Sequence, residues 1–303
     1  MSRQLQVGVQ LPEVEYESRW ANQLELAELI EAAGFDSIWV GDHLLYSDDR
    51  GAIGPWEAWT QLAALGAVTD RVFLGPLVAS TSFHAPAMLA KLASTVDEIS
   101  GGRLILGLGA GWNRTEYDAF GFPYDHRVSR FEEAFEIIRR LVGGETVTFS
   151  GEYFTVADSV LEPSSAKPGG PPIMLGSQGE RMLAIAAPHI QWWNSWYAWH
   201  GNDPAKLAPL HRKVDEALLA AGRDPAEVVK TAAALVQFDE GAGRQTAYMP
   251  RVPLTPISGT TIEIADELRR WHANGVDHLQ LVLDPITVPS IEKAAAVLAA
   301  LRR

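Results

Sequence analysis

The stretch Ser100-Gly-Gly-Arg-Leu-Ile-Leu-Gly-Leu-Gly-Ala-Gly-Trp-Asn113 decides how this chain folds. A short apolar run stands between glycines and leads into a turn that ends in an indole and an amide. Such a run is typical of a parallel β-strand that is covered on both faces. Because parallel strands carry ligands at their carboxyl ends, functional groups are expected between Gly109 and Asn113.

Short β-rich runs alternate with helix-periodic segments along the chain, which is the pattern of βα units in a parallel sheet. One such segment has a stripe of apolar residues at Phe131, Phe135, Ile138 and Val142 that needs a sheet to cover it. The 303 residues suit one (β/α)8 TIM barrel. We therefore predict an α/β fold, a single barrel domain over residues 1–303, with strands at 5–11, 37–42, 72–78, 103–109, 172–176, 190–195, 229–237 and 278–283.

Three segments are longer than the short connections of a barrel, namely 43–55, 146–171 and 239–259. Alternating residues around Ser150-Gly151 predict a β-hairpin at 146–156. The last segment contains Pro250, Pro253 and Pro256. Long loops in compact folds are lids, binding loops or disordered segments. We predict that 239–259 is a lid over the site, with surface disorder as the alternative.

Composition excludes several classes of function. The net charge of −13 argues against nucleic acid or an anionic membrane as a partner, and the absence of cysteine excludes disulfides and thiolate chemistry. No spacing of metal ligands is present, so no metal site is predicted. The first residues lack the apolar core of a signal peptide, and no apolar run is long enough to span a membrane. We expect a cytoplasmic protein that acts on a small molecule.

Asp42 and His43 follow the predicted strand 37–42 and are expected at the same barrel face as Gly109. A histidine there could polarise a substrate oxygen or move a proton at neutral pH. The alternative is that His43 only fixes the loop by bonding to a backbone carbonyl. His84 and His126, after the third and fourth strands, are weaker candidates and are expected to be structural or solvent-facing.

A phosphate site is predicted just after the fifth strand, because successive backbone N–H groups precede a helix beside a hydroxyl and a guanidinium. Ser177 could instead serve only as a helix N-cap. The glycines at 107, 109 and 111 do not make a dinucleotide fingerprint, because Trp112 stands where a further glycine is required. The predicted phosphate residues are Gly176, Ser177, Gln178, Gly179 and Arg181.

Indoles gather in and beyond the sixth strand, where the sequence reads Gln191-Trp-Trp-Asn-Ser-Trp196. Some of them must fill the barrel core, and those that reach past the strand end can form a pocket wall or stack on a ring. Trp112, Trp193 and Trp196 are predicted to line the substrate pocket.

The chain resembles the bacterial luciferase-like superfamily of flavin- or coenzyme F420-dependent oxidoreductases over nearly its whole length. The resemblance is carried by Ala33-Gly-Phe-Asp-Ser-Ile-Trp-Val-Gly-Asp-His43, the 100–113 stretch, Glu116-Tyr117, Phe120-Gly121, Pro172-Ile-Met-Leu-Gly-Ser177 and Ala273-Asn-Gly-Val-Asp-His-Leu279. It implies a (β/α)8 barrel that holds a deazaflavin or FMN at the carboxyl ends of its strands, and a homodimer.

The resemblance also implies roles for single residues. The ring would lie against the third and fourth strands, with a non-prolyl cis peptide somewhere in Leu77-Val78-Ala79. Gly109, Ala110, Gly111 and Asn113 would line the ring and the ribityl chain, and the Gly176–Gly179 loop with Arg181 the phosphate. Asp42 and His43 match the pair near ring and substrate in F420-dependent alcohol and sugar-phosphate dehydrogenases.

Two positions depart from the family pattern. F420-dependent glucose-6-phosphate dehydrogenases have a carboxylate where this chain has Trp112, which argues against that substrate. The family's Ala-Asp-Gly-Trp-Asn appears here as His189-Ile-Gln-Trp-Trp-Asn194, which leaves open which indole packs on the site.

The predicted function is hydride transfer between F420 and a small organic substrate, with His43 polarising or protonating the substrate oxygen. The main alternative is an FMN-dependent two-component monooxygenase that uses dioxygen. A flavin or F420 reductase would supply the reduced cofactor. A second alternative is a non-catalytic barrel that only binds the cofactor.

Overall fold

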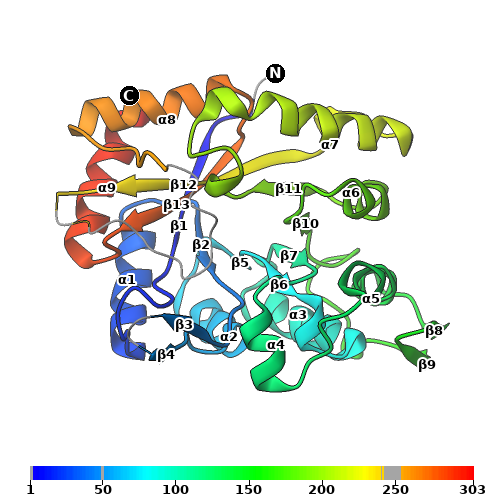
Figure 1. Cartoon of the computed structure of the whole chain (residues 1–303). Helices are drawn as coiled ribbons and strands as arrows, with labels where there is room; N and C mark the ends of the chain where they lie inside the picture. Colours follow the sequence, from blue (N-terminus) through cyan, green and yellow to red (C-terminus); the bar gives the residue numbers. More distant parts are fainter. Residues whose placement is uncertain (1–2, 49–50, 240, 242–253) are drawn as a thin grey trace.

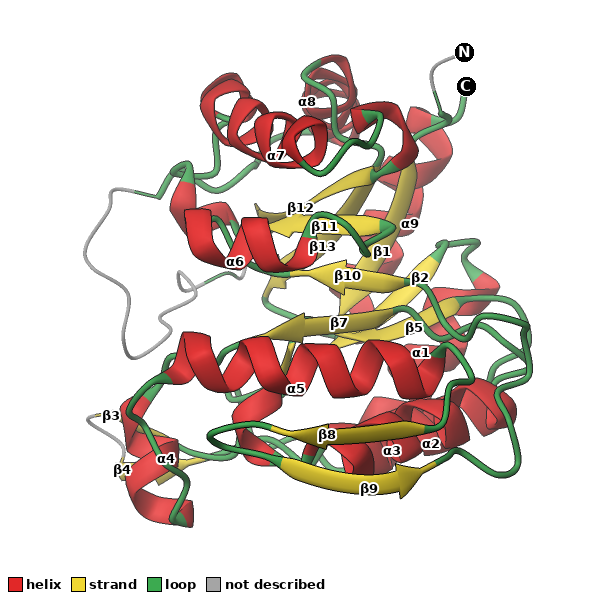
Figure 2. Cartoon of the chain, turned by 90° about the vertical axis from the view of Figure 1, so that its right-hand side faces the viewer, coloured by secondary structure: helices red, strands yellow, loops and turns green. Residues whose placement is uncertain are grey.

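Parallel strands form the centre of the molecule and helices lie around them (Figures 1 and 2). The computed structural model describes residues 3–48, 51–239, 241 and 254–303. The sheet strands are β1 (Gln6–Gln10), β2 (Ser37–Val40), β5 (Phe73–Pro76), β6 (Ala79–Ser80), β7 (Leu106–Gly109), β10 (Ile173–Leu175), β11 (Trp192–Ser195), β12 (Val229–Gln237) and β13 (His278–Asp284). The helices are α1 (Trp20–Ala32), α2 (Ala58–Val68), α3 (Pro86–Ile99), α4 (Arg114–Phe120), α5 (Arg127–Val142), α6 (Glu180–Ala186), α7 (Ala208–Ala220), α8 (Thr261–Ala273) and α9 (Val288–Leu301).

The strand order confirms the predicted TIM barrel. It is β5-β2-β1-β13-β12-β11-β10-β7-β6, with every pair parallel. β5 and β6 are two parts of the third barrel strand, which is interrupted at Leu77 and Val78. The circle closes because Leu74 bridges to Leu104 and Ala79 pairs with Leu108. The described residues thus contain the eight predicted strands, the third of them split.

The core explains why the strand sequences are so apolar. β13 is buried at each of its positions, because the barrel interior covers one face and helices cover the other. At the amino-terminal end of the barrel, Trp39, Ile105 and Met174 form a small interior cluster. Gly75 gives this cluster room, since a Cβ there would lie 2.7 Å from the Trp39 ring. Side chains therefore fill this part of the barrel interior, and a cavity opens near the carboxyl ends of the strands.

Two of the three long segments form hairpins. β3 (Tyr46–Asp48) pairs with β4 (Gly51–Ile53), and β8 (Val147–Ser150) pairs with β9 (Thr155–Ser159), which confirms the hairpin predicted at 146–156. In the third segment, Ile257 bridges to Val236. Residues 240 and 242–253 lie outside the described residues, so the role of segment 239–259 as a lid over the site stays a prediction. No helix in the described part of the chain is both long and apolar enough to cross a bilayer.

Arg103, from the opening stretch, holds the turn before the fourth barrel strand in place. Its guanidinium donates to the carbonyl oxygens of Gly66, Thr69, Val72 and Ser100, and also to the Thr69 hydroxyl. The side chain thereby ties the end of α2 to the entrances of β5 and of the fourth barrel strand. Charge-assisted hydrogen bonds of this kind are stronger than neutral ones.

We expect Arg103→Ala to lower the free energy of unfolding by about 3 kcal/mol, because it leaves several carbonyl oxygens without a donor. Urea denaturation measures the change. The control is Arg71→Ala, whose guanidinium donates to the backbone carbonyl of Glu31 at an exposed site and should cost less than about 1 kcal/mol. Equal denaturation midpoints for the two variants would contradict the role given to Arg103.

Candidate active site

A cavity of about 530 Å³ opens at the carboxyl ends of the barrel strands. Residues of β1, β6, β7 and β11 line it, together with the loops that follow β2, β7 and β10. Most of the predicted site residues meet here, although they are far apart in sequence. The predicted residues that line it are Asp42, His43, Leu77, Val78, Gly109, Ala110, Gly111, Trp112, Gly176, Ser177, Gln178, Gly179 and Trp196.

His43 is held at the cavity by a carboxylate. Its Nδ1 lies 3.0 Å and 3.2 Å from the two carboxylate oxygens of Glu116, in the first turn of α4. Glu116 is fully buried and also accepts the backbone N–H of Leu44 at 2.6 Å. Tyr46 and Trp112 flank the imidazole at 4.8 Å and 5.5 Å between ring centroids. Nδ1 is therefore engaged, and Nε2 is the ring nitrogen left for a ligand.

The protonation of this cluster is perturbed by burial and by neighbouring charges. Burial alone lowers the pKa of His43, but the hydrogen bond that Nδ1 donates to Glu116 and the charges of Glu13, Glu116 and Asp42 outweigh it, so the pKa is raised. Burial raises the pKa of the Asp42 carboxyl to about 7, although the N–H of Ser80, at 2.8 Å from Oδ2, stabilises its anion. Asp42 therefore changes charge near neutral pH, and His43 holds its proton to a higher pH than an ordinary imidazole does.

Glycines shape the opposite wall. A Cβ at Gly109 would lie 2.9 Å from the Val78 side chain, and one at Gly176 would lie 2.7 Å from it. Gly111 has a φ of +72°, and a Cβ there would lie 2.0 Å from the Tyr117 hydroxyl. The wall therefore has no room for side chains and presents backbone and Val78 to a ligand. The cis peptide lies between Leu77 and Val78, inside the predicted stretch.

The loop after β10 runs along the same wall. Ser177 Oγ accepts the N–H of Gly179 at 3.3 Å, so one amide of this loop is already engaged. The N-cap of α6 is Gly179 and no side chain caps this helix, so the alternative that Ser177 is its N-cap is wrong. The cavity also receives Arg127, the first residue of α5, which sequence reasoning did not select. Its guanidinium lies over the Tyr124 ring at 3.8 Å and provides a positive charge near this loop.

Four predicted residues do not line the cavity. Ala79 is buried in the core between barrel and helices. Asn113 is the N-cap of α4, and its Nδ2 donates to the carbonyl of Leu45. Neither side chain faces the cavity, because that of Ala79 packs in the core and that of Asn113 is hydrogen-bonded within the protein, and their contact with the cofactor stays a prediction. Asn113 instead connects the Trp112 turn to the segment that follows His43.

The other two are Arg181 and Trp193. Arg181 is exposed and pairs with Glu132 at 2.6 Å, outside the cavity. Trp193 is fully buried, and its indole N–H donates to the carbonyl of Ser177 at 2.7 Å. Trp193 therefore supports the loop after β10 from within the core, and its place in the substrate pocket stays a prediction.

Several cavity residues were missed, among them Glu13, Glu116, Gln10 and Trp199. Glu116 belongs to a stretch that carried the family resemblance, but nothing in its spacing shows that it meets His43. His84 and His126 were expected outside the chemistry, and neither lines the cavity. His126 is exposed beside Tyr153.

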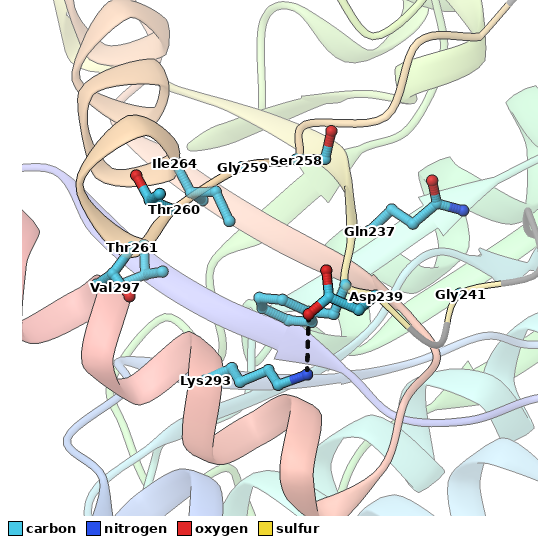
Figure 3. Close-up of a pocket in the computed structure, with 11 residues that line it drawn as sticks. Gln237, Asp239, Gly241, Ser258, Gly259, Thr260, Thr261, Ile264, Lys293 and Val297 are labelled. Carbon is cyan, nitrogen blue, oxygen red and sulfur yellow. Dashed lines mark ion pairs between the residues drawn. The ribbon is translucent and has the colours of Figure 1, made fainter.

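A second cavity of about 410 Å³ lies between β12, α8 and α9 (Figure 3). Lys293 faces Asp239 across it, with 3.9 Å between the charged atoms. The start of α8 is closed by a capping box in which Thr260 and Glu263 bond to each other's backbone N–H groups. The capping groups at the start of α8 are thus hydrogen-bonded to each other. His43, Asp42 and Glu116 line the first cavity, which we therefore take as the candidate active site. In the described ranges no cluster of His, Asp and Glu could hold a metal ion.

Comparisons with known proteins identify the family of this chain and its fold. The family model described as luciferase-like monooxygenase matches residues 5–254. The chain is 32% identical over 222 residues to a 5,10-methylenetetrahydromethanopterin reductase of Archaeoglobus fulgidus, which covers 73% of this chain and 62% of that protein. It is also 32% identical over 191 residues to the pyrimidine monooxygenase RutA of Enterobacter sp., covering 61% of this chain and 52% of that protein. The chain thus spans little more than half the length of these relatives.

Solved structures show the same fold over the full chain. An F420-dependent secondary alcohol dehydrogenase in complex with an F420-acetone adduct superposes with a TM-score of 0.82 at 22% identity, covering 100% of both chains. The monooxygenase RslO1 from Streptomyces bottropensis superposes with a TM-score of 0.80 at 21% identity, covering 98% of this chain and 100% of that one. The family model matches residues 5–254, which are most of this chain, and this match shows that the chain belongs to the luciferase-like monooxygenase family.

Proposed function

We propose that the chain is an oxidoreductase that transfers a hydride between coenzyme F420 and a small organic substrate. The observation that carries this proposal is the His43–Glu116 pair at the cavity, opposite a wall of glycines. Hydride transfer to a carbonyl carbon adds a proton to its oxygen, and hydride transfer from the alcohol carbon releases that proton, and a histidine hydrogen-bonded to a carboxylate is suited to that step. The family contains both F420-dependent and flavin-dependent enzymes, so the choice of cofactor is part of the proposal.

The residues present fit a flat heterocycle with an anionic tail. Gly109 and Gly176 leave no Cβ between Val78 and the cavity, so a planar ring can approach the backbone closely. The backbone of the Gly176–Gly179 loop and the guanidinium of Arg127 would hold the phosphate. The cavity volume of about 530 Å³ lies in the range of small-molecule sites.

Bound F420 would supply the ring carbon that gives or takes the hydride. The chain's own residues position the substrate and handle the proton. Glu116 fixes Nδ1 of His43, so Nε2 can hold the substrate oxygen and exchange a proton with it. Tyr46 and Trp112 pack against the imidazole and shield it from water.

The experiment that tests the cofactor is a titration of the purified protein with F420 and with FMN, each oxidised and reduced, with an oxygen electrode in parallel. We expect F420 to bind and reduced F420 to be stable in air. FMN binding with oxygen consumption would instead indicate the two-component monooxygenase. Tight F420 binding without turnover of any alcohol, ketone or enone would indicate the non-catalytic barrel. A homodimer and a reductase partner stay predictions.

His43→Ala should lower kcat by about 10²- to 10⁴-fold, because it removes the group that exchanges the proton with the substrate oxygen. The affinity for F420, measured by fluorescence titration, should stay within twofold of the parent's. The matched control is His84→Ala, a histidine outside the cavity, which should keep its turnover. Full turnover by His43→Ala would contradict the proposed role of His43 in proton exchange with the substrate oxygen.

Glu116→Gln should lower the pKa of His43, because it removes the anionic partner of Nδ1. Protonated His43 stabilises the fold below its unfolded pKa of about 6.5, and this stabilisation is lost as the pH rises through the raised folded value. Glu116→Gln should therefore cost more stability at about pH 6 than at about pH 9. NMR titration of the imidazole measures the pKa directly.

Urea denaturation at the two pH values measures the stability. Glu132→Gln, which removes an exposed partner of Arg181, is the control and should leave the His43 titration unchanged. An unchanged or higher His43 pKa in Glu116→Gln would contradict the electrostatic role of Glu116.

A further inference from the structure

The turn after β11 brings two indoles to the cavity, and the proposed mechanism does not use them. Trp196 and Trp199, which begin and end this turn, both line the cavity, and we call them the indole pair. In the closed barrel order, β11 is four strands from β2 in either direction, so the turn lies across the barrel mouth from His43. The indole pair therefore faces, from the other side of the cavity, a substrate whose oxygen is held at His43.

Asn202 ties this turn to the sheet through its side-chain amide. The residue is 6% exposed, and its Oδ1 accepts the backbone N–H of Leu235 on β12 at 2.9 Å. Its Nδ2 donates to the carbonyl oxygens of Leu235 and Thr255, each at 2.9 Å. The backbone N–H of Asn202 donates to the carbonyl oxygen of Tyr197 at 2.8 Å, within the turn. One buried amide thus joins three separate segments of the chain, an arrangement we call the Asn202 clamp.

The position suits asparagine for two reasons. Its φ of +57° lies in the left-handed region, which asparagine adopts more readily than most residues. In addition, β11 pairs with β12 as far as Ser195 and Ala232, and farther along β12 the carboxamide pairs with the N–H and the carbonyl of Leu235 as a neighbouring strand would. An aspartate would keep the shape and the acceptor and lose both donors.

The packing of the turn passes this constraint on to the indole pair. Tyr197 is 1% exposed and shares an apolar cluster with Leu235. Trp196 and Leu254 pack against the same cluster. The N–H of Trp199 donates to the carbonyl oxygen of Trp196 at 2.9 Å, so both indoles belong to one hydrogen-bonded turn. Because packed side chains transmit displacement, a shift of the turn at the Asn202 clamp also shifts the indole pair.

We propose that Asn202 is a positioning residue that holds the indole pair at a fixed distance from His43 and thereby determines which substrates fit. Asn202 itself does not line the cavity, so it acts through Trp196 and Trp199. The indoles offer apolar faces, so they select the carbon skeleton of an alcohol or ketone whose oxygen lies at His43. The inference rests on the proposed function for this class of substrate, whereas the Asn202 clamp can be tested without turnover.

The first test compares Asn202→Asp with the parent protein, both loaded with F420. Steady-state kinetics follow the reduction of F420 by isopropanol, cyclopentanol and cyclohexanol. For the best alcohol we expect KM to rise about tenfold and kcat to stay within about threefold, because His43 is untouched and only binding contacts are lost. The preference for this alcohol over the next should fall about fivefold, and the dissociation constant of F420 should stay within about twofold. A change that only lowered stability would leave KM of the folded enzyme unchanged.

The second test measures the Asn202 clamp by hydrogen-exchange mass spectrometry of the parent and Asn202→Asp proteins without substrate. Segments 197–203 and 254–257 should both exchange about tenfold faster in the variant, because a carboxylate cannot donate to the carbonyl oxygens that Nδ2 holds. The matched control is Asn274→Asp. Asn274 ends α8, is exposed, and donates its Nδ2 to the carbonyl oxygen of Arg270 at 2.8 Å, so this variant should keep KM and both exchange rates.

If Asn202→Asp does not fold, Asn202→Gly accepts the positive φ without strain, removes the amide and must show the same rise in KM at nearly constant kcat. An unchanged KM, or a fall in kcat without a rise in KM, overturns the positioning role. An equal loss of F420 affinity also overturns it, because the indoles would then hold the cofactor. Unchanged exchange in either segment overturns the Asn202 clamp. A parent protein that binds F420 but turns over no alcohol, ketone or enone contradicts the proposed function instead, and the exchange rates still decide the clamp.

Discussion

The side chain of Val78 occupies the space that a Cβ would need at Gly109 and at Gly176. The break in the third barrel strand can approach the ends of β7 and β10 because β7 ends in Gly109 and Gly176 directly follows β10. A larger residue at either position would push the third strand outward and change the floor of the cavity. The flat wall and the position of the loop after β10 both depend on this one packing constraint.

The strands could be predicted because both of their faces are covered. A buried parallel strand is a continuous apolar run, and glycines mark its ends, so β7 was found from the 103–109 run and β12 with its observed bounds. The interruption of the third strand was not predictable from this pattern. Leu77 and Val78 are as apolar as their neighbours, and only pairing with two different partners separates β5 from β6.

Most of the predicted residues that directly follow a strand line the cavity. Predicted residues whose polar groups are already hydrogen-bonded within the protein do not line it. His43 follows β2 and reaches the cavity, but its partner Glu116 is 73 positions away on a short helix. An acid in the first turn of a helix is ordinary helix chemistry, so its sequence gives no sign of a buried contact. Asn113 and Trp193 have the right side chains for ligand binding, but an N-cap and a backbone carbonyl take their polar groups first. Composition cannot distinguish these two uses.

The carboxyl groups around His43 determine how many protons the cavity holds near neutral pH. Glu13, Asp42 and Glu116 all lie near one imidazole, and their mutual repulsion is relieved if one of them, or the ring, binds a proton. The pKa of Asp42 rises to about 7 and that of His43 rises as well, so protons are retained together within the same cluster. In the proposed reaction the oxygen of the substrate must gain or lose one proton as the hydride moves. A cluster that shares its protons can serve either direction, because it can be left one proton richer or poorer without creating an isolated buried charge.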